Sequence, residues 1–166
     1  MAYAEAGDRE RARVLDEDNL RRARELRNEQ LEATTLDGLA RHALDDGRLE
    51  DAVSMAAESL QLYHSLSDPH GAAIELRRIA QALALKGRSQ MAARLLAGAE
   101  AMHKEIGGTM SWVAKMRDAA LVAIRQELDE AAVAKAWEEG LQLTADEAVA
   151  LAVDEALRVA ATAWTL

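Results

Sequence analysis

Residues 68–100 read DPHGAAIELRRIAQALALKGRSQMAARLLAGAE and hold one complete helix–turn–helix pattern. Asp68 and Pro69 favour a helix start, because an Asp side chain accepts hydrogen bonds from free backbone N–H groups and Pro has no N–H to leave unpaired. Apolar residues then recur three and four positions apart, which places them on one helical face. Gly87 favours a left-handed turn between two helices. The stretch therefore predicts helices over 70–86 and 89–106.

The same pattern recurs at a fixed period along the chain. Gly7, Gly47 and Gly87 are equally spaced, and large apolar residues follow the same period. The clearest apolar columns are Leu15, Met55 and Leu95, then Leu26, Leu66 and Ile106, and then Leu36, Leu76 and Met116. One helix pair cannot bury its apolar face alone, so successive pairs must stack. The repeat predicts an all-α fold, an α-solenoid of antiparallel helix pairs.

The register of the repeat also predicts the order of the elements. It gives the end of a helix at residues 1–6, a helix over 8–27, the pairs 30–46 with 49–66 and 70–86 with 89–106, and a helix over 110–127. No helix-breaking residue marks the junction near Asn28, so one continuous helix over 8–46 is the alternative. The repeats then occupy residues 1–127 with the first unit truncated, and the chain is either a fragment or a stand-alone protein.

Beyond residue 127 the repeat pattern fades. Asp129 favours the start of a short helix over 130–139, and Thr144 with Glu147 forms a capping box before a helix over 145–160. Trp112 and Trp137 are expected to pack in the same region. We expect residues 128–166 to form a C-terminal helical cap that covers the open end of the stack.

The composition narrows the classes of function. The chain has 166 residues, no Cys and a formal net charge of −9, which argues against nucleic acid as a direct partner. Polar residues interrupt every apolar stretch before it reaches about 18 residues, and the first ten residues lack the apolar segment of a secretory signal. We therefore expect a cytoplasmic protein with no membrane-spanning segment.

Residues that could carry chemistry are scattered along the chain. No two of the four histidines have ligand spacing, and no phosphate-binding loop of the GxxxxGK[ST] type occurs. Acidic residues near the C-terminal end fall at helix starts or on polar faces, where a solvated role is expected. The sequence therefore predicts no enzyme, no metal site and no cofactor. The four histidines are His42, His64, His70 and His103.

The helix–turn–helix unit resembles the tetratricopeptide (TPR) repeat. The resemblance is carried by Leu36, Leu39, Ala40, Ala43, Gly47 and Ala52, and by Leu76, Ile79, Ala80, Leu83, Gly87 and Ala92. The period is longer than that of the usual TPR, and most of the usual aromatic residues are replaced. The resemblance implies that the first helix of each unit lines a concave groove. The residues expected to contact a partner there are Arg41, His42, Glu75, Arg77, Arg78 and Gln81.

A second resemblance concerns residues 91–101, 134–141 and 143–149. These segments are similar to the last repeats of large bacterial ATP-binding transcriptional regulators of the LuxR type and of the adenylate-cyclase-associated type. The resemblance implies a non-enzymatic scaffold or sensor arm that binds a protein, a peptide or other domains of a longer chain. A small-ligand-sensing domain with an effector in the groove is the alternative. The open start of the stack also predicts self-association, as a homodimer, through residues 1–30.

Overall fold

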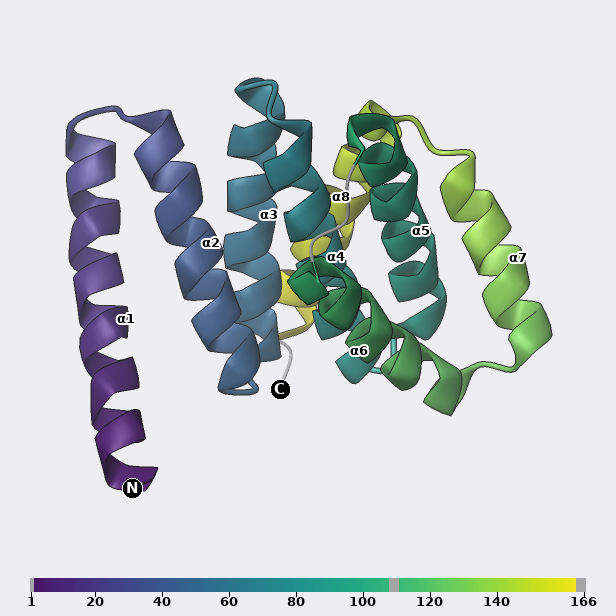
Figure 1. Ribbon diagram of the computed structural model, residues 1–166, viewed down its shortest axis with the longest axis horizontal. Coiled ribbons are helices and arrows are strands. Elements are labelled where there is room, and N and C mark those ends of the chain that lie inside the picture. Colours follow the sequence, from purple (N-terminus) through teal and green to yellow (C-terminus); the bar gives the residue numbers. More distant parts are fainter. Residues whose placement is uncertain (1, 108–110, 164–166) are drawn as a thin grey trace.

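The computed structural model describes residues 2–107 and 111–163 (Figure 1). All regular structure within these ranges is helical, so the all-α prediction is confirmed. None of the described helices is long and apolar enough to cross a membrane. The helices are α1 (Ala2–Glu25), α2 (Glu29–Asp45), α3 (Leu49–Ser65), α4 (Pro69–Leu85), α5 (Ser89–Ile106), α6 (Ser111–Glu127), α7 (Glu130–Leu141) and α8 (Ala145–Ala163).

The turns that end α1 to α5 each contain a residue with positive φ, and these residues are evenly spaced along the chain. Their residues with positive φ are Arg27, Gly47, Ser67, Gly87 and Gly107. After each of the first four, the next N–H donates to a carbonyl five residues earlier, as in the 2.9 Å bond from Asn28 N to Ala23 O. This pairing is a Schellman-type helix end. The predicted turn near Asn28 is therefore confirmed, and the continuous helix over 8–46 is wrong.

The predicted break at Gly7 is also wrong, because α1 runs without interruption from Ala2 to Glu25. A glycine inside a helix costs only about 1 kcal/mol. Ion pairs along the same helix offset part of that cost, such as those from Arg13 to Glu10 and to Glu17. The other turn glycines, Gly47 and Gly87, have positive φ.

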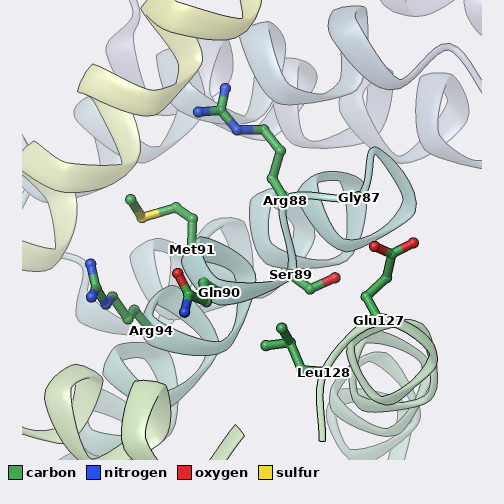
Figure 2. A pocket seen from close by; sticks show the side chains of 8 residues that line it. All are labelled: Gly87, Arg88, Ser89, Gln90, Met91, Arg94, Glu127 and Leu128. Carbon is green, nitrogen blue, oxygen red and sulfur yellow. The ribbon is translucent and has the colours of Figure 1, made fainter. Parts of the chain in front are cut away.

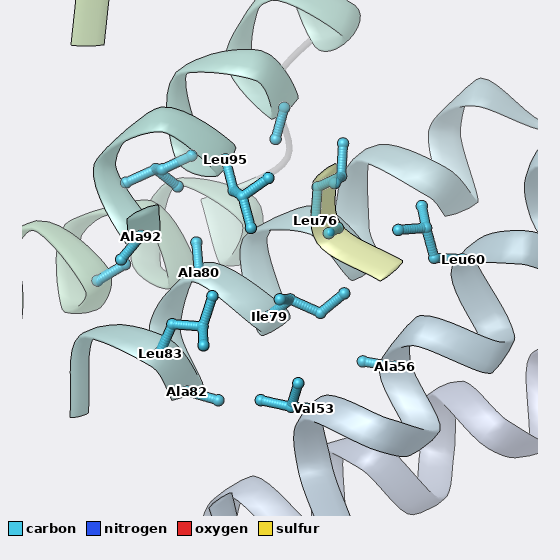
Figure 3. Close-up of a cluster of buried hydrophobic side chains, with 14 of the residues drawn as sticks. Val53, Ala56, Leu60, Leu76, Ile79, Ala80, Ala82, Leu83, Ala92 and Leu95 are labelled. Carbon is cyan, nitrogen blue, oxygen red and sulfur yellow. The ribbon is translucent and has the colours of Figure 1, made fainter. Parts of the chain in front are cut away.

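α4 is the central helix of the fold. α3 and α5 pack along its two sides, and both α6 and α8 also contact it. In Figure 1, α6 lies in front of α4 and α8 lies behind it. Figure 3 shows apolar side chains of α4, including Leu76 and Ile79, between those of α3 and those of α5. Nearly the whole surface of α4 from Gly71 to Ala84 is buried as a result.

Small side chains allow these helices to approach closely. The alanine columns of the repeat are fully buried in the helices α2 to α6. Substituting a larger side chain there would require the packed backbones to separate. These residues are Ala40, Ala52, Ala80, Ala92 and Ala120.

The two C-terminal helices begin at the predicted caps. Asp129 Oδ1 accepts a 2.7 Å bond from Ala132 N, and Glu147 accepts a 2.8 Å bond from Thr144 N. The helices extend slightly further than predicted, to Leu141 and Ala163. Their placement differs from a cap on the end of the stack. α7 packs against α5, whereas α8 folds back across α3, α4 and α5.

Polar and apolar contacts both hold α8 in this position. The buried Glu155 of α8 forms an ion pair with Arg88, and His64 Nε2 lies 3.1 Å from Asp146 Oδ1. An apolar stripe on α8 packs on the same core, and its buried members are Ala148, Val149, Ala152, Ala156 and Val159. The apolar stripe of α8 therefore packs on the surface formed by α3, α4 and α5.

Candidate interaction surface

The surface of α4 that the TPR resemblance places in an open groove is covered by other helices. Glu75, Arg77 and Arg78 were expected on its outward surface, but their side chains are 0%, 0% and 3% exposed. The packing of α6 and α8 on α4 is the physical reason, since it covers the surface that an open solenoid would leave free. The predicted outward orientation of these three residues is therefore wrong.

Arg77 instead holds α4 to α5. Its Nε donates a 2.9 Å bond to Glu100 Oε1, and its Nη1 donates a 3.1 Å bond to Ala73 O. Nη2 reaches the backbone of α5 at Ala99 O, at 3.4 Å. A buried guanidinium needs such partners to offset the loss of its hydration. The arrangement makes Arg77 a structural residue.

Arg78 and Glu75 form a second buried cluster that joins α4 to α2. Arg78 Nη2 lies 2.6 Å from Asp37 Oδ1, and Nη1 donates to Glu75 Oε1. Burial raises the pKa of Glu75 to about 8, because the Arg78 guanidinium offsets only part of the desolvation and the Asp37 carboxylate adds to the rise. The raised pKa favours the protonated form of Glu75, and Asp37 also pairs with the Arg78 charge.

The other three predicted contact residues have different environments. Arg41 is exposed on α2, whereas His42 and Gln81 are half-buried. His42 Nε2 lies 3.5 Å from Asp16 Oδ2 of α1. Of the six predicted residues, only Arg41 offers a fully exposed side chain to a partner.

An exposed face of α6 was not anticipated from the sequence. Trp112, Lys115, Ala119 and Val122 are spaced three or four apart and all are exposed. We call this stripe the α6 open face. Trp112 is 42% exposed and Val122 is 62% exposed, so the stripe has a large exposed apolar residue at each end.

The repeat register shows why the α6 open face is unusual. Ala119 corresponds to Leu39 in α2 and to Ile79 in α4, and both of these side chains are buried. α6 buries Val113, Ala120 and Ile124, and the first two of these correspond to fully buried alanines in α2 and α4. It also makes little contact with α7, which packs on α5 instead. Positions 115 and 119 are therefore exposed on α6, although the equivalent positions of α2 and α4 are buried. The only sequence signal is the change to a small residue at position 119.

A pocket of about 450 Å³ lies at the start of α5, next to the end of α6. Figure 2 shows Arg88 and Arg94 pointing away from Ser89, toward different neighbouring helices. Arg88 pairs with Glu155 of α8, and Arg94 pairs with Glu139 of α7. Both cations are thus already neutralised. The pocket is lined by Gly87, Arg88, Ser89, Gln90, Met91, Arg94, Glu127 and Leu128.

The histidines and acidic residues do not gather into a metal site. Among residues 2–107 and 111–163, no group of three His, Asp or Glu side chains is placed to hold an ion. The rings of His70 and His103 lie 5.9 Å apart, with His103 buried. Trp137 packs against the hydrophobic core, as expected, whereas Trp112 is exposed.

Comparisons of the chain with protein-family models, with curated proteins and with solved structures gave no match. The resemblances to TPR-like repeats and to bacterial transcriptional regulators therefore stay predictions.

Proposed function

We propose that this chain is a non-enzymatic protein-interaction module built from TPR-like helical repeats, and that the α6 open face binds a helix of a partner protein. The observation that carries the proposal is the exposed stripe itself, with Trp112 and Val122 at its two ends. The positions equivalent to Lys115 and Ala119 are buried in both α2 and α4. A partly exposed Trp on such a stripe has the character of an interface anchor.

The backbone pattern supports a TPR-like scaffold. Helices α2, α3 and α4 have 17 residues each, and α5 has 18. Turns with positive φ recur at even intervals, and each repeat unit contains two of them. Stacked helix pairs of this kind present rigid helical faces to partners at little entropic cost.

The chemistry of the α6 open face specifies the partner. Lys115 lies between Trp112 and Ala119 on the stripe, so the partner needs an acidic residue beside its apolar anchors. A helix with apolar residues at positions i, i+4 and i+7 would match the spacing of the stripe. The proposed partner is therefore an acidic amphipathic helix, supplied by another protein or by another domain of a longer chain.

The similarity of residues 91–101 and 134–149 to bacterial regulators supports one biological setting. In that setting the module is the scaffold or sensor arm of a cytoplasmic signalling or transcriptional regulator. A helix docked on α6 would couple the arm to the rest of the regulator.

The test uses a designed helical peptide with apolar anchors at i, i+4 and i+7 and Glu beside the central anchor. A matched peptide carries Lys in place of that Glu. Fluorescence anisotropy should show that the Glu peptide binds at least about tenfold more tightly, and that Val122→Asp removes about tenfold in affinity or more. Leu157→Asp, at a similarly exposed apolar residue on α8, should leave binding unchanged.

Three results would contradict the proposed site. Binding of neither peptide, equal binding of both, or undiminished binding to the Val122→Asp variant would contradict a helix site on α6. Circular dichroism of each variant separates a local effect from unfolding.

The pocket at the start of α5 favours small-ligand sensing as a second candidate function. Its volume of about 450 Å³ lies within the usual range of small-molecule sites, although its lining is largely polar. Calorimetry with a panel of small polar metabolites tests this candidate. Heat that disappears in the Arg94→Gln variant would support it, and the lack of any heat would exclude ligands of that class.

A further inference from the structure

The repeat register identifies a second face that is open, on α1. In α3, Ser59 Oγ donates a 2.9 Å bond to Ala33 O of α2. In α5, Ala99 O accepts from Arg77 of α4, at 3.4 Å. Ser59 and Ala99 thus mark the face with which the second helix of each pair contacts the first. Asn19 is their counterpart in α1, one repeat unit before Ser59 and two before Ala99.

The corresponding face of α1 faces no helix in the described chain. α1 packs against α2 through the face that includes Ala23, and it makes no comparable contact with another described helix. Leu15 is 63% exposed, whereas its counterparts Met55 and Leu95 pack in the core. Leu26 is 73% exposed. We call this the α1 outer face, and its members are Asp8, Arg11, Leu15, Asp18, Asn19, Arg22 and Leu26.

The charges on the α1 outer face are arranged symmetrically about Leu15. Asp8 lies seven residues before Leu15 and Arg22 lies seven residues after it. Arg11 and Asp18 lie four before and three after. The intervals of three and four keep all five side chains on one helical face. An acidic residue on one side of Leu15 is therefore matched by a basic residue on the other.

We propose that a second copy of this chain covers the α1 outer face, with the two α1 helices packed antiparallel about a two-fold axis near Leu15. This arrangement brings Leu15 against its own counterpart. It sets Asp8 of each copy opposite Arg22 of the other, and Arg11 opposite Asp18. A parallel pairing would instead oppose like charges along the whole face. The self-complementary pattern is what a two-fold interface requires.

The proposed dimer is weak and sensitive to salt. One helix pair buries less than the roughly 1,600 Å² of a standard protein interface, so the dissociation constant falls in the micromolar range. The charges involved are solvent-exposed: Asp8 and Arg22 side chains are 78% and 68% exposed. Their attraction is therefore screened as the ionic strength rises.

Sedimentation equilibrium of the full chain, over about 1 to 300 µM, tests the proposal. The wild type should form a dimer that dissociates in high salt. Arg22→Asp should weaken it at least about tenfold, because Asp8 then faces a like charge at both ends of the pair. Asp8→Arg should weaken it equally, for the mirror reason.

A mixture of the two charge variants tests the antiparallel pairing most directly. In a heterodimer of Asp8→Arg with Arg22→Asp, both end pairs again join opposite charges, so the mixture should dimerise as the wild type does. Each variant keeps one fewer intrahelical ion pair, since Arg22 pairs with Asp18 and Arg11 with Asp8. Helicity by circular dichroism confirms that α1 remains formed.

Val122→Asp alters the α6 open face and should leave the dimer intact. The dimer and the helix-binding site on α6 can therefore be tested separately. A wild type that is monomeric at every concentration would overturn the dimer. So would a mixture of the two charge variants that stays monomeric while the wild type dimerises, because that result removes the antiparallel pairing.

Discussion

α7 approaches α5 closely at Gly140, and replacing this residue by alanine should loosen this end of the fold. An ideal Cβ at position 140 would lie 2.9 Å from Arg94 C and 2.7 Å from the Ala97 Cβ, and Arg94 O would be closer still. Nonbonded carbon atoms prefer a separation of about 3.5–4.0 Å. Arg94 O belongs to the helical backbone and cannot rotate aside, so α7 must move away. We expect Gly140→Ala to lower the free energy of unfolding by about 1–3 kcal/mol.

Gly98 provides a matched control in α5. A Cβ there would lie 3.4 Å from the Ala148 Cβ, which is close to ordinary van der Waals contact. Alanine is favoured over glycine inside a helix by about 0.5–1 kcal/mol, so Gly98→Ala should be neutral or slightly stabilising. Urea denaturation followed by circular dichroism measures both free energies. Equal effects of the two substitutions, or a Gly140→Ala variant as stable as the wild type, would refute the close packing of α7 on α5.

The turns and the buried charges provide three further tests. Arg27→Gly and Ser67→Gly should each stabilise the fold by about 0.5–1 kcal/mol in thermal melts, because both residues have positive φ; destabilisation would count against the shared turn. Burial raises the pKa of Glu75 from 4.5 to about 8, so the folded state binds this proton more tightly than the unfolded state does. The free energy of unfolding should therefore fall as the pH rises from 4.5 to 8, and Glu75→Gln should flatten this dependence. Urea titrations in which the variant keeps the pH profile of the wild type would contradict the raised pKa. Arg77→Glu should cost about 3–5 kcal/mol, because it places a second carboxylate beside Glu100 in the core, and a variant with wild-type stability would contradict the buried pairing.

The helices and their turns could be predicted from the sequence because they depend on local signals. Asp68, Asp129 and Thr144 each cap the helix that the sequence assigned to them. The turn at Arg27 has no local signal, and only the register of the repeat predicted it. The same register failed at Gly7, where no turn forms.

The burial of the α4 charges could not be predicted, because their partners lie on other helices. Arg77 pairs with Glu100 of α5, and Arg78 pairs with Asp37 of α2. Along α4 alone these residues look like a solvated face, and the Glu75–Arg78 spacing of three residues is the one local hint of pairing. A sequence pattern does not show whether α6 and α8 will cover that face. Hence five of the six predicted contact residues are buried or half-buried, and the α6 open face was missed.

The proposed role of α6 can be located residue by residue in solution. The amide spectrum of the ¹⁵N-labelled chain, titrated with the Glu-bearing helical peptide, should show its largest shift changes along α6, around Trp112, Lys115, Ala119 and Val122. The start of α5 and the exposed side of α2 around Arg41 should change little. Shift changes centred on the α5 pocket or on α2, with α6 unaffected, would contradict the assignment of the partner site to the α6 open face.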